Sequence, residues 1–422
     1  MIRRWLGVQT PVQLYLAVVA VLLPLQFTDV IRRGITLFHI VNFVVVGGFV
    51  LLLILRGVRI RWYLLFPMWL LLVASLLGMF NSSSVFLNTY TLSIDVYIYV
   101  WFLMLAAFIA SEDDVNVLTR VWVLMAAGIV LFYLRDLSSI GAIRSEFTFG
   151  NPNRAGTYFM ASFYFLFSPA LTGRPWLRAG LGTLFFTAAL ATTSVAILVS
   201  FVLSGFVMLI TLLYTRGHGR QIAALSAVML LIVAGFAFAR TDPEELVRER
   251  LPLVFLRAPR SLSTRTQIWT AGLEIFQEHP FGIGPQSFFA QVDIGLGNKG
   301  GIELHSDFVA NLVERGFLGL LALFLVYAVV GLRLLSMARA ARRLQRRDLG
   351  MWTGALAGVV VGYFVYSVTH QALHHDTLWL IFALIFAQSE MVRRAEGLPA
   401  AAPAASALPR VPVPAAPGLR RS

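Results

Sequence analysis

The chain has 422 residues, of which 58% are hydrophobic and only 13% are charged, and its mean hydropathy is +0.77. A soluble domain carries about twice that share of charge and a disordered chain needs low hydrophobicity, so both classes are excluded. The formal charge of +13 would suggest nucleic acid in a soluble protein, but basic residues also orient membrane helices. The absence of cysteine excludes disulfides, zinc–thiolate sites and iron–sulfur clusters.

Apolar stretches of about 17–25 residues are long enough to cross a bilayer as helices. The sequence contains about twelve such stretches and therefore predicts an all-α polytopic membrane protein. The seventh and eighth are separated only by residues 192–194. In chain order, the predicted spans lie near 12–28, 36–55, 63–80, 93–110, 117–134, 155–171, 177–192, 195–214, 221–239, 317–336, 352–369 and 377–391.

The distribution of arginine orients the predicted bundle, because cytoplasmic loops of membrane proteins are enriched in basic residues. With both termini in the cytoplasm, that side holds 21 arginines against 6 acidic residues, a net charge of +15. The outer side holds 13 basic residues against 15 acidic residues, a net charge of −2. The basic balance therefore indicates topology and gives no reason to expect a nucleic-acid partner.

Two predicted connections on the outer side are long, at about 135–154 and 240–316. The second contains five aromatic residues between positions 269 and 289, so we expect a partly helical loop that caps the bundle. The Ala/Pro-rich end of the chain is typical of a disordered tail. The predicted division is spans one to nine in 1–239, the outer loop in 240–316, spans ten to twelve in 317–392 and a cytoplasmic tail in 393–422.

A basic patch lies in this outer loop, on the side where arginine is expected to be scarce. A stretch of the loop, 250–273, contains four arginines and no acidic residue. A solvated surface would explain the patch, and so would an anion site, since guanidinium groups match phosphate oxygens in pairs. The four residues are Arg250, Arg257, Arg260 and Arg265.

The residues around Arg265 favour the anion site. Thr264 and Gln267 fit a capping box, which predicts a helix that begins at Arg265 and ends near Glu278. Arg265 would then lie beside the free N–H groups and the positive dipole end of that helix. This combination predicts a binding site for pyrophosphate.

A histidine follows in the same loop, in Leu304-His305-Ser306-Asp307, shortly before the tenth span. A lone histidine is usually structural, but this one lies near the bilayer surface with the arginine patch. A neutral imidazole there is suited to act as a general base. We expect Glu314 and Arg315 to pair with each other or with the loop, and Glu314 is a candidate for orienting a catalytic group.

Polar residues elsewhere have two interpretations each. His370 and His374 are four residues apart, a spacing that can hold a metal, but a polar rim at the outer surface is the favoured interpretation. Asp95 lies within a predicted span, where a carboxylate is expensive, so it is either functional or an interfacial residue.

The motif His305-Ser306, nine residues, then Gly316-x-x-Gly319 resembles the His-[Asn/Ser/Gln]-x9-Gly-x-x-Gly signature of bacterial O-antigen ligases. Arg265-x3-Trp269 and the turn 280–284, Pro-Phe-Gly-Ile-Gly, also look like that family and its relatives, the O-antigen polymerases. So does the segment 150–154, Gly-Asn-Pro-Asn-Arg, in the other outer loop. In topology, the resemblance covers most of the chain.

The sequence departs from this family at the junction of the seventh and eighth spans. Relatives often carry an arginine after Thr-x-Ser, whereas here Ser194 is followed by Val195. In this chain, the role of that arginine would be absent or would be taken by another residue. Arg154 is the candidate, because it is predicted on the same side of the membrane.

The resemblance implies a GT-C-like glycosyltransferase of the bacterial inner membrane with its active site on the periplasmic face. The donor would be a glycan on undecaprenyl pyrophosphate and the acceptor a sugar hydroxyl of lipid A–core, with no nucleotide sugar, cofactor or metal. The reaction would invert the anomeric centre. The candidate site consists of His305 and Arg265 as catalytic residues and Arg154, Arg260, Arg257, Asn153, Glu314 and Arg315 as substrate-binding residues.

Other functions stay open on sequence alone. An O-antigen polymerase or a protein O-oligosaccharyltransferase would use the same kind of donor with a different acceptor. A polyprenyl-lipid flippase or transporter would need ionisable residues mid-span and broken helices, whereas the predicted spans are nearly free of charge.

Overall fold

A computed structural model of the chain describes residues 8–25, 29–31, 35–56, 60–82, 84–133, 147–171, 175–192, 194–218, 258–288 and 303–397. Within these ranges the chain forms twelve α-helices, a 3-10 turn η1 (Pro169–Leu171) and a two-stranded antiparallel hairpin of β1 (Asp29–Ile31) and β2 (Ile35–Thr36). The helices are α2 (Pro11–Leu22), α3 (Leu37–Arg56), α4 (Leu65–Met79), α5 (Val85–Phe108), α6 (Glu112–Phe132), α8 (Pro152–Phe165), α9 (Pro175–Ala191), α10 (Val195–Thr215), α13 (Ala258–Glu278), α15 (Asp307–Arg343), α16 (Arg347–Thr369) and α17 (Asp376–Ala395).

The helical architecture is that of a polytopic membrane protein, as the sequence predicted. Every predicted span overlaps one of these helices except the ninth, near 221–239, which lies outside the described residues. Six of the described helices are long and apolar enough to cross a membrane, namely α3, α5, α6, α10, α15 and α16. The break between α9 and α10 at 192–194 is confirmed, and α17 continues three residues into the predicted tail. The total number of spans and the GT-C-like class stay predictions.

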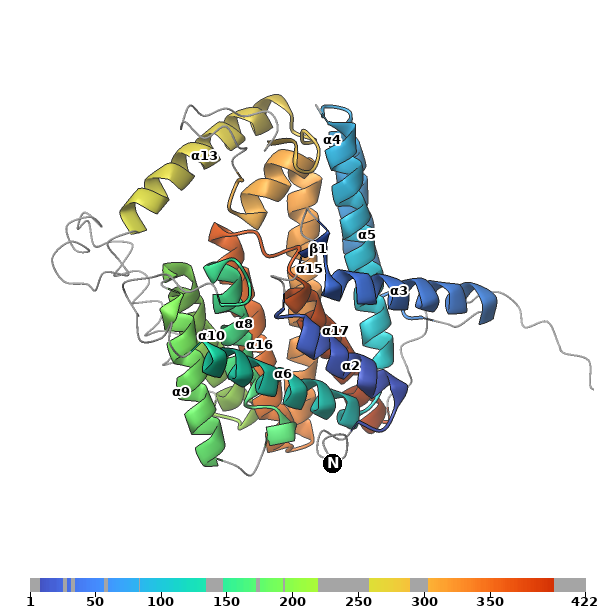
Figure 1. Cartoon of the computed structure of the whole chain (residues 1–422), viewed down its shortest axis with the longest axis vertical. Helices are drawn as coiled ribbons and strands as arrows, with labels where there is room; N and C mark the ends of the chain where they lie inside the picture. The colour runs from blue at the N-terminus through green and yellow to red at the C-terminus, as the bar shows by residue number, and fades with distance from the viewer. Residues whose placement is uncertain are drawn as a thin grey trace, which may run out of the picture.

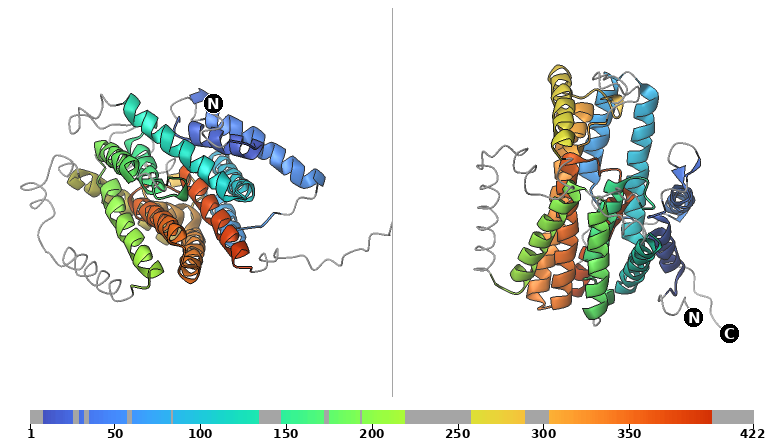
Figure 2. Two further views of the ribbon diagram at one scale, coloured as in Figure 1. Left: turned by 90° about the horizontal axis from the view of Figure 1, so that it is seen from below. Right: turned by 60° about the vertical axis from the view of Figure 1, so that its left-hand side comes forward.

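The axes of α5, α10, α15 and α16 run in roughly the same direction, while α3 runs across it (Figures 1 and 2). The helix α13 lies over one end of this bundle, next to the beginning of α15 and the connection between α4 and α5 (Figure 1). The main core is rich in buried aromatic side chains, among them Trp101, Trp122, Trp352 and Trp379. One end of the bundle thus lies under α13, where the outer loop was predicted.

A stripe of glycines lets α16 and α10 pack closely. Four glycines recur at every fourth residue of α16 and therefore share one face. A Cβ on Gly358 would lie 2.8 Å from the backbone oxygen of Ser204 in α10, and one on Gly354 would lie 3.2 Å from that of Met208. Small residues allow such close approach between membrane helices, where packing rather than water exclusion drives association. The stripe consists of Gly350, Gly354, Gly358 and Gly362.

The glycine motif after His305 breaks α15. Gly316 has φ 65° and ψ −169°, a backbone conformation that essentially only glycine adopts. The turn 280–284 packs against this break through three backbone hydrogen bonds: Ile283 N–H to the oxygen of Val313 (3.2 Å), Gly284 N–H to that of Glu314 (2.8 Å) and Phe317 N–H to that of Pro280 (3.2 Å). The two glycine-containing segments of the sequence thus form one packed unit.

Replacing Gly316 by alanine is expected to destabilise the protein by at least about 2 kcal/mol. The added Cβ would be strained at this φ and would collide with the backbone of Pro280 and Phe281. The midpoint of thermal unfolding in detergent measures the effect. Gly331→Ala is the matched control, because it changes the same helix where nothing lies within 4 Å of the new Cβ. Equal midpoints for the two variants would contradict the close packing at Gly316.

Candidate functional site

The helix that carries Arg265 begins earlier than predicted. It starts at Ala258, so Thr264 is not its N-cap and Arg265 lies inside the helix rather than at its first position. Pro259 is compatible with the first turn, since its missing N–H group has no helical partner there in any case. The expected pyrophosphate site at a helix N-terminus is therefore wrong for Arg265. Any anion must be bound by its side chain.

The guanidinium of Arg265 contacts the last interhelical loop. Its Nη2 atom lies 3.3 Å from Nε2 of His370. Because arginine can only donate, Nε2 of His370 must be the unprotonated acceptor, and its Nδ1–H then donates to Thr369 Oγ1 at 3.0 Å. The imidazole is stacked on Tyr366, with ring centroids 4.4 Å apart. A rigid neutral histidine thus orients the arginine.

Hydrogen bonds hold the residues on both sides of His305. The indole N–H of Trp269 in α13 donates to the oxygen of Leu304 at 2.8 Å, and Ser306 caps α15 through Val309 N–H at 3.3 Å. His305 itself has φ 48°, in the left-handed region. Its side chain is 44% exposed and lies 4.0 Å from the carboxylate of Glu303. The imidazole is therefore fixed at its base and accessible at its ring.

Partial burial lowers the pKa of His305 below its ordinary value. The carboxylate of Glu303 raises that pKa and the positive charge of Arg265 lowers it further. The ring is therefore neutral near pH 7, as a general base must be. Arg265 contacts His370, and Asp307, two residues after His305, donates its backbone N–H to the oxygen of the same His370 at 3.2 Å, so both predicted catalytic residues lie near this loop.

Arg154 lies at the start of a different helix, α8. Asn151 caps α8, accepting the N–H groups of Asn153 (2.8 Å) and Arg154 (3.4 Å) on its side-chain oxygen, and Pro152 occupies the first helical position. The segment 150–154 is thus a helix start. It exposes Arg154, whereas Asn153 is half-buried.

Both arginines lie near the loop between α16 and α17: Arg265 contacts His370, and the charge of Arg154 acts on His375. Burial, and next the charge of Arg154, lower the pKa of His375 in this loop well below its ordinary value. The junction between α9 and α10 lies beside α8: a Cβ on Gly156 would lie 3.1 Å from Thr192 Oγ1. Arg154 therefore lies two residues before a close contact with this junction, where the resemblance led us to expect an arginine.

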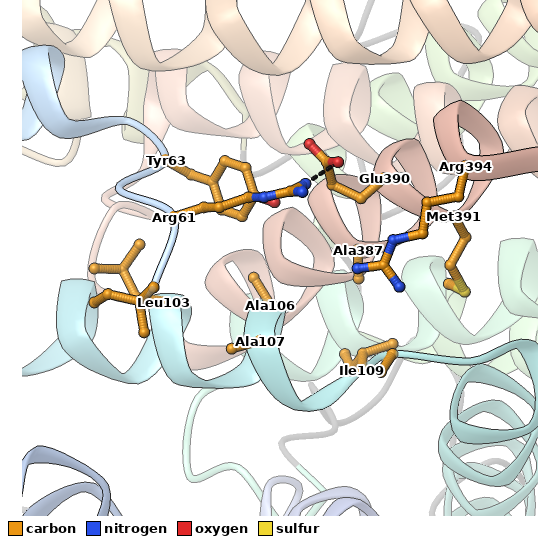
Figure 3. Close-up of a pocket in the computed structure, with 12 residues that line it drawn as sticks. Arg61, Tyr63, Leu103, Ala106, Ala107, Ile109, Ala387, Glu390, Met391 and Arg394 are labelled. Atoms are coloured by element: carbon orange, nitrogen blue, oxygen red, sulfur yellow. Dashed lines mark ion pairs between the residues drawn. The ribbon is translucent and has the colours of Figure 1, made fainter. Parts of the chain in front are cut away.

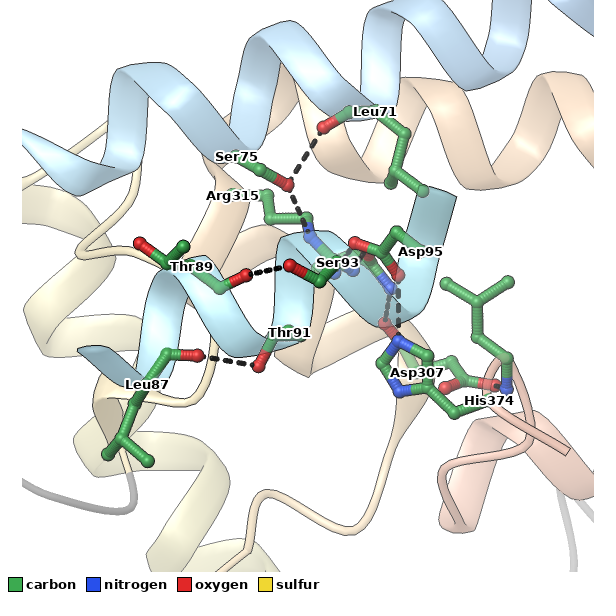
Figure 4. Close-up of polar contacts among 12 residues, drawn as sticks. Leu71, Ser75, Leu87, Thr89, Thr91, Ser93, Asp95, Asp307, Arg315 and His374 are labelled. Atoms are coloured by element: carbon green, nitrogen blue, oxygen red, sulfur yellow. Dashed lines mark hydrogen bonds and ion pairs between the residues drawn. The ribbon is translucent and has the colours of Figure 1, made fainter. Parts of the chain in front are cut away.

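Arg315 is buried, and within the described part of the chain its ion-pair partner is Asp95 rather than Glu314 or the outer loop. Its Nη2 donates to Asp95 Oδ2 at 2.6 Å and its Nε to Ser75 at 2.9 Å (Figure 4). Its Nη1 donates to Asn311 at 2.8 Å. Only 4% of its side chain is exposed. The structure thus separates Arg315 from the accessible candidates and gives it partners from α4, α5 and α15.

Glu314 does meet the loop, as expected. Its carboxylate accepts the backbone N–H groups of Gln286 and Phe288, which follow the turn 280–284. Ile268 of α13 packs in a small separate core with Phe288 and Val313. Glu314 thus fastens the segment after α13 to the first part of α15. It thereby helps to fix α13, and with it Arg265, above the bundle.

Two buried carboxylates tie the loop between α16 and α17 to the bundle (Figure 4). Asp95 accepts His374 Nε2–H at 2.8 Å in addition to Arg315. Asp307 accepts the backbone N–H groups of Ala372 (2.8 Å) and Leu373 (3.0 Å). Asp95, singled out from sequence as either functional or interfacial, is the shared acceptor that connects the loop to α15.

The side chains of two candidate residues, Arg257 and Arg260, are not described. Arg257 lies outside the described residues, and Arg260 belongs to α13 but its side chain is not described. Among the residues that the structure describes, no three His, Cys, Asp or Glu residues are grouped to hold a metal ion. His370 has the role of a polar contact to Arg265, which the spacing of the histidines did not reveal.

The chain is thus a polytopic helical membrane protein, and at one end of its bundle Arg265 of α13 contacts His370. A family model described as O-Antigen ligase matches residues 179–324, which include Arg265, His305 and the Gly316-x-x-Gly319 motif. This match covers 146 of the 422 residues and agrees with the resemblance of the sequence motifs to the O-antigen ligase family. No curated protein matches the chain.

Proposed function

We propose that the protein is an O-antigen ligase of the bacterial inner membrane, acting at the periplasmic face. It transfers a glycan from undecaprenyl pyrophosphate to a sugar hydroxyl of lipid A–core. Two contacts at the loop between α16 and α17 support the proposal. Arg265 contacts His370, and Asp307, two residues after His305, donates its backbone N–H to the oxygen of His370 at 3.2 Å. Donor and acceptor are both lipid-anchored, so a polar site at one end of an apolar bundle suits transfer between them.

The arginines would stabilise the leaving group. As the bond between the anomeric carbon and the pyrophosphate oxygen breaks, negative charge grows on that oxygen. Guanidinium groups already positioned there lower the barrier by about 2–4 kcal/mol each, by analogy with single oxyanion-hole donors. The contact of His370 with Arg265 fixes the guanidinium before the donor arrives, which reduces the reorganisation needed in the transition state.

His305 would act on the acceptor. Its neutral ring takes the proton of the acceptor hydroxyl while the hydroxyl oxygen attacks the anomeric carbon, and the undecaprenyl pyrophosphate departs with the electron pair. General-base assistance of this kind contributes about 10²–10⁴-fold. A single displacement inverts the anomeric centre. No metal ion is needed in this scheme, because arginine neutralises the charge of the leaving group.

The rate of transfer is expected to fall as the pH falls through the pKa of His305. Because that pKa is lowered from 6.5, the ring is neutral at pH 7 and the acidic limb has its midpoint below 6.5. Since Glu303 raises the pKa, Glu303→Gln moves the limb to still lower pH. Initial rates of transfer between pH 5 and 8 measure both effects. A midpoint above 6.5, or a limb that Glu303→Gln does not move, would contradict the role of His305.

The acceptor separates the proposed activity from its relatives within the family. A ligase deletion leaves long polymer on undecaprenyl pyrophosphate and none on lipid A–core, whereas a polymerase deletion leaves a single repeat on the core. Purified protein in liposomes, given a defined undecaprenyl-pyrophosphate glycan and lipid A–core, tests the ligase directly. A protein O-oligosaccharyltransferase would modify a polypeptide instead, and a flippase would move the donor without transfer.

A further inference from the structure

A second polar site lies at the opposite end of the bundle from Arg265 and His305. The helix α17 begins at Asp376, beside the loop of the candidate active site, and Glu390 follows fourteen residues later, about 21 Å along the helix. There, a cavity of about 180 Å³ opens between α5, α17 and the segment that precedes α4 (Figure 3). This end also carries the beginning of α16 with Arg347, and it was predicted to face the cytoplasm.

Two guanidiniums and one carboxylate line this cavity. Arg61 forms an ion pair with Glu390, whose side chain is only 6% exposed, so the carboxylate is already neutralised. Arg394 lines the cavity as well and extends into it toward Ile109 (Figure 3). A third guanidinium stands behind the wall, since Arg333 lies over the rings of Tyr63 (5.9 Å) and Phe386 (5.4 Å). The charged groups that line the cavity therefore sum to +1, and Arg333 adds a second positive charge behind the rings of Tyr63 and Phe386.

The rest of the lining is apolar and small. Alanine side chains of α5 and α17 leave the space open, and Ile109 and Met391 complete the apolar wall. Next to Arg61, the indole of Trp62 is 54% exposed, and Leu65 and Phe66 are exposed nearby, as expected of residues that face lipid at the membrane boundary. The excess positive charge lies beside an apolar wall and a lipid-facing surface. This combination fits a ligand with an anionic group and a hydrocarbon chain.

We propose that this cavity binds the phosphate headgroup of an anionic membrane phospholipid, with Arg394 and Arg61 as its cationic contacts. Guanidinium groups match phosphate oxygens in pairs, and the alanine wall accommodates the glycerol and the first carbons of the acyl chains. The proposal is independent of the glycosyltransferase activity. It concerns a site on the other side of the membrane from the proposed transfer.

Native mass spectrometry of the purified protein tests this assignment with phosphatidylglycerol, phosphatidylcholine and inorganic phosphate as probes. Arg394→Gln is expected to weaken phosphatidylglycerol binding about five-fold, which is the effect of one basic residue near an anionic lipid surface. Arg347→Gln is the matched control, because it removes the same charge from an exposed position at the same end of the bundle, outside the cavity lining. Both positions are exposed, so neither variant is expected to unfold.

We expect the wild type and Arg347→Gln to retain phosphatidylglycerol, and Arg394→Gln to retain it more weakly. We also expect the wild type to retain phosphatidylcholine more weakly than phosphatidylglycerol. Equal losses in the two variants would show general charge attraction and overturn the cavity as the site. Unchanged binding in Arg394→Gln would overturn it as well. If inorganic phosphate alone displaced the lipid at equal concentration, the site would recognise free phosphate and the lipid assignment would be wrong.

Discussion

Replacing Arg265 by alanine is expected to lower the rate of glycan transfer about 10²–10³-fold, while the protein stays folded in the membrane. The expectation follows from the proposed contact with the leaving pyrophosphate, since loss of one preorganised donor costs about 2.7–4 kcal/mol in the transition state. The side chain contacts His370 at the candidate site and is only half-buried, so its removal leaves no large cavity. Initial rates with a defined donor and acceptor measure the loss.

Two further variants make this measurement specific. Gln267→Ala changes an exposed residue two positions along α13 and is expected to keep wild-type activity. Arg265→Lys keeps the charge but loses the paired donors, so we expect it to recover only part of the rate. An Arg265→Ala protein that transferred glycan at the wild-type rate would remove Arg265 from the mechanism.

Replacing Asp95 by asparagine is expected to destabilise the protein by about 3–5 kcal/mol. The change leaves the charge of Arg315 buried without its counterion, which is the costly way to break a buried ion pair. It also weakens the hydrogen bond from His374, so the loop between α16 and α17 loses its tie to α5. The midpoint of thermal unfolding in detergent measures the change.

A double variant separates charge from packing at this position. In Asp95→Leu/Arg315→Met, neither buried charge remains, and we expect the double variant to be more stable than Asp95→Asn alone. Ser93→Ala, on an exposed face of the same helix, is the control that should match the wild type. If Asp95→Asn unfolded at the wild-type midpoint, the buried pair would not be what holds the loop in place.

The helices were predictable because membrane spans leave a strong local signal. A continuous apolar run of sufficient length forms a helix in lipid whatever its tertiary neighbours are, so the stretches near 36–55 and 195–214 gave α3 and α10 almost residue for residue. The start of α13 was not predictable in this way. The pattern Thr264-x-x-Gln267 has the composition of a cap, but Ala258 and the five residues after it continue the helix toward the N-terminus.

The site was only partly predictable, for a different reason. Single residues such as Arg265 and His305 stood out through local charge and motif spacing. Their partners depend on contacts between distant segments: His370 follows Arg265 by 105 residues, and Arg315 follows Asp95 by 220. No local pattern specifies such pairs. The predicted partner for Arg315 was its neighbour Glu314 or the outer loop, whereas Arg315 pairs with Asp95 and Glu314 meets the loop.

The most direct test of the account is transfer by the purified protein reconstituted with an undecaprenyl-pyrophosphate glycan of known anomeric configuration and with lipid A–core. The account predicts a glycan joined to the core with inverted configuration, in the presence of EDTA, and about 10²–10⁴-fold slower formation by His305→Ala. Transfer that retains the configuration, or that proceeds equally fast with His305→Ala, would contradict it.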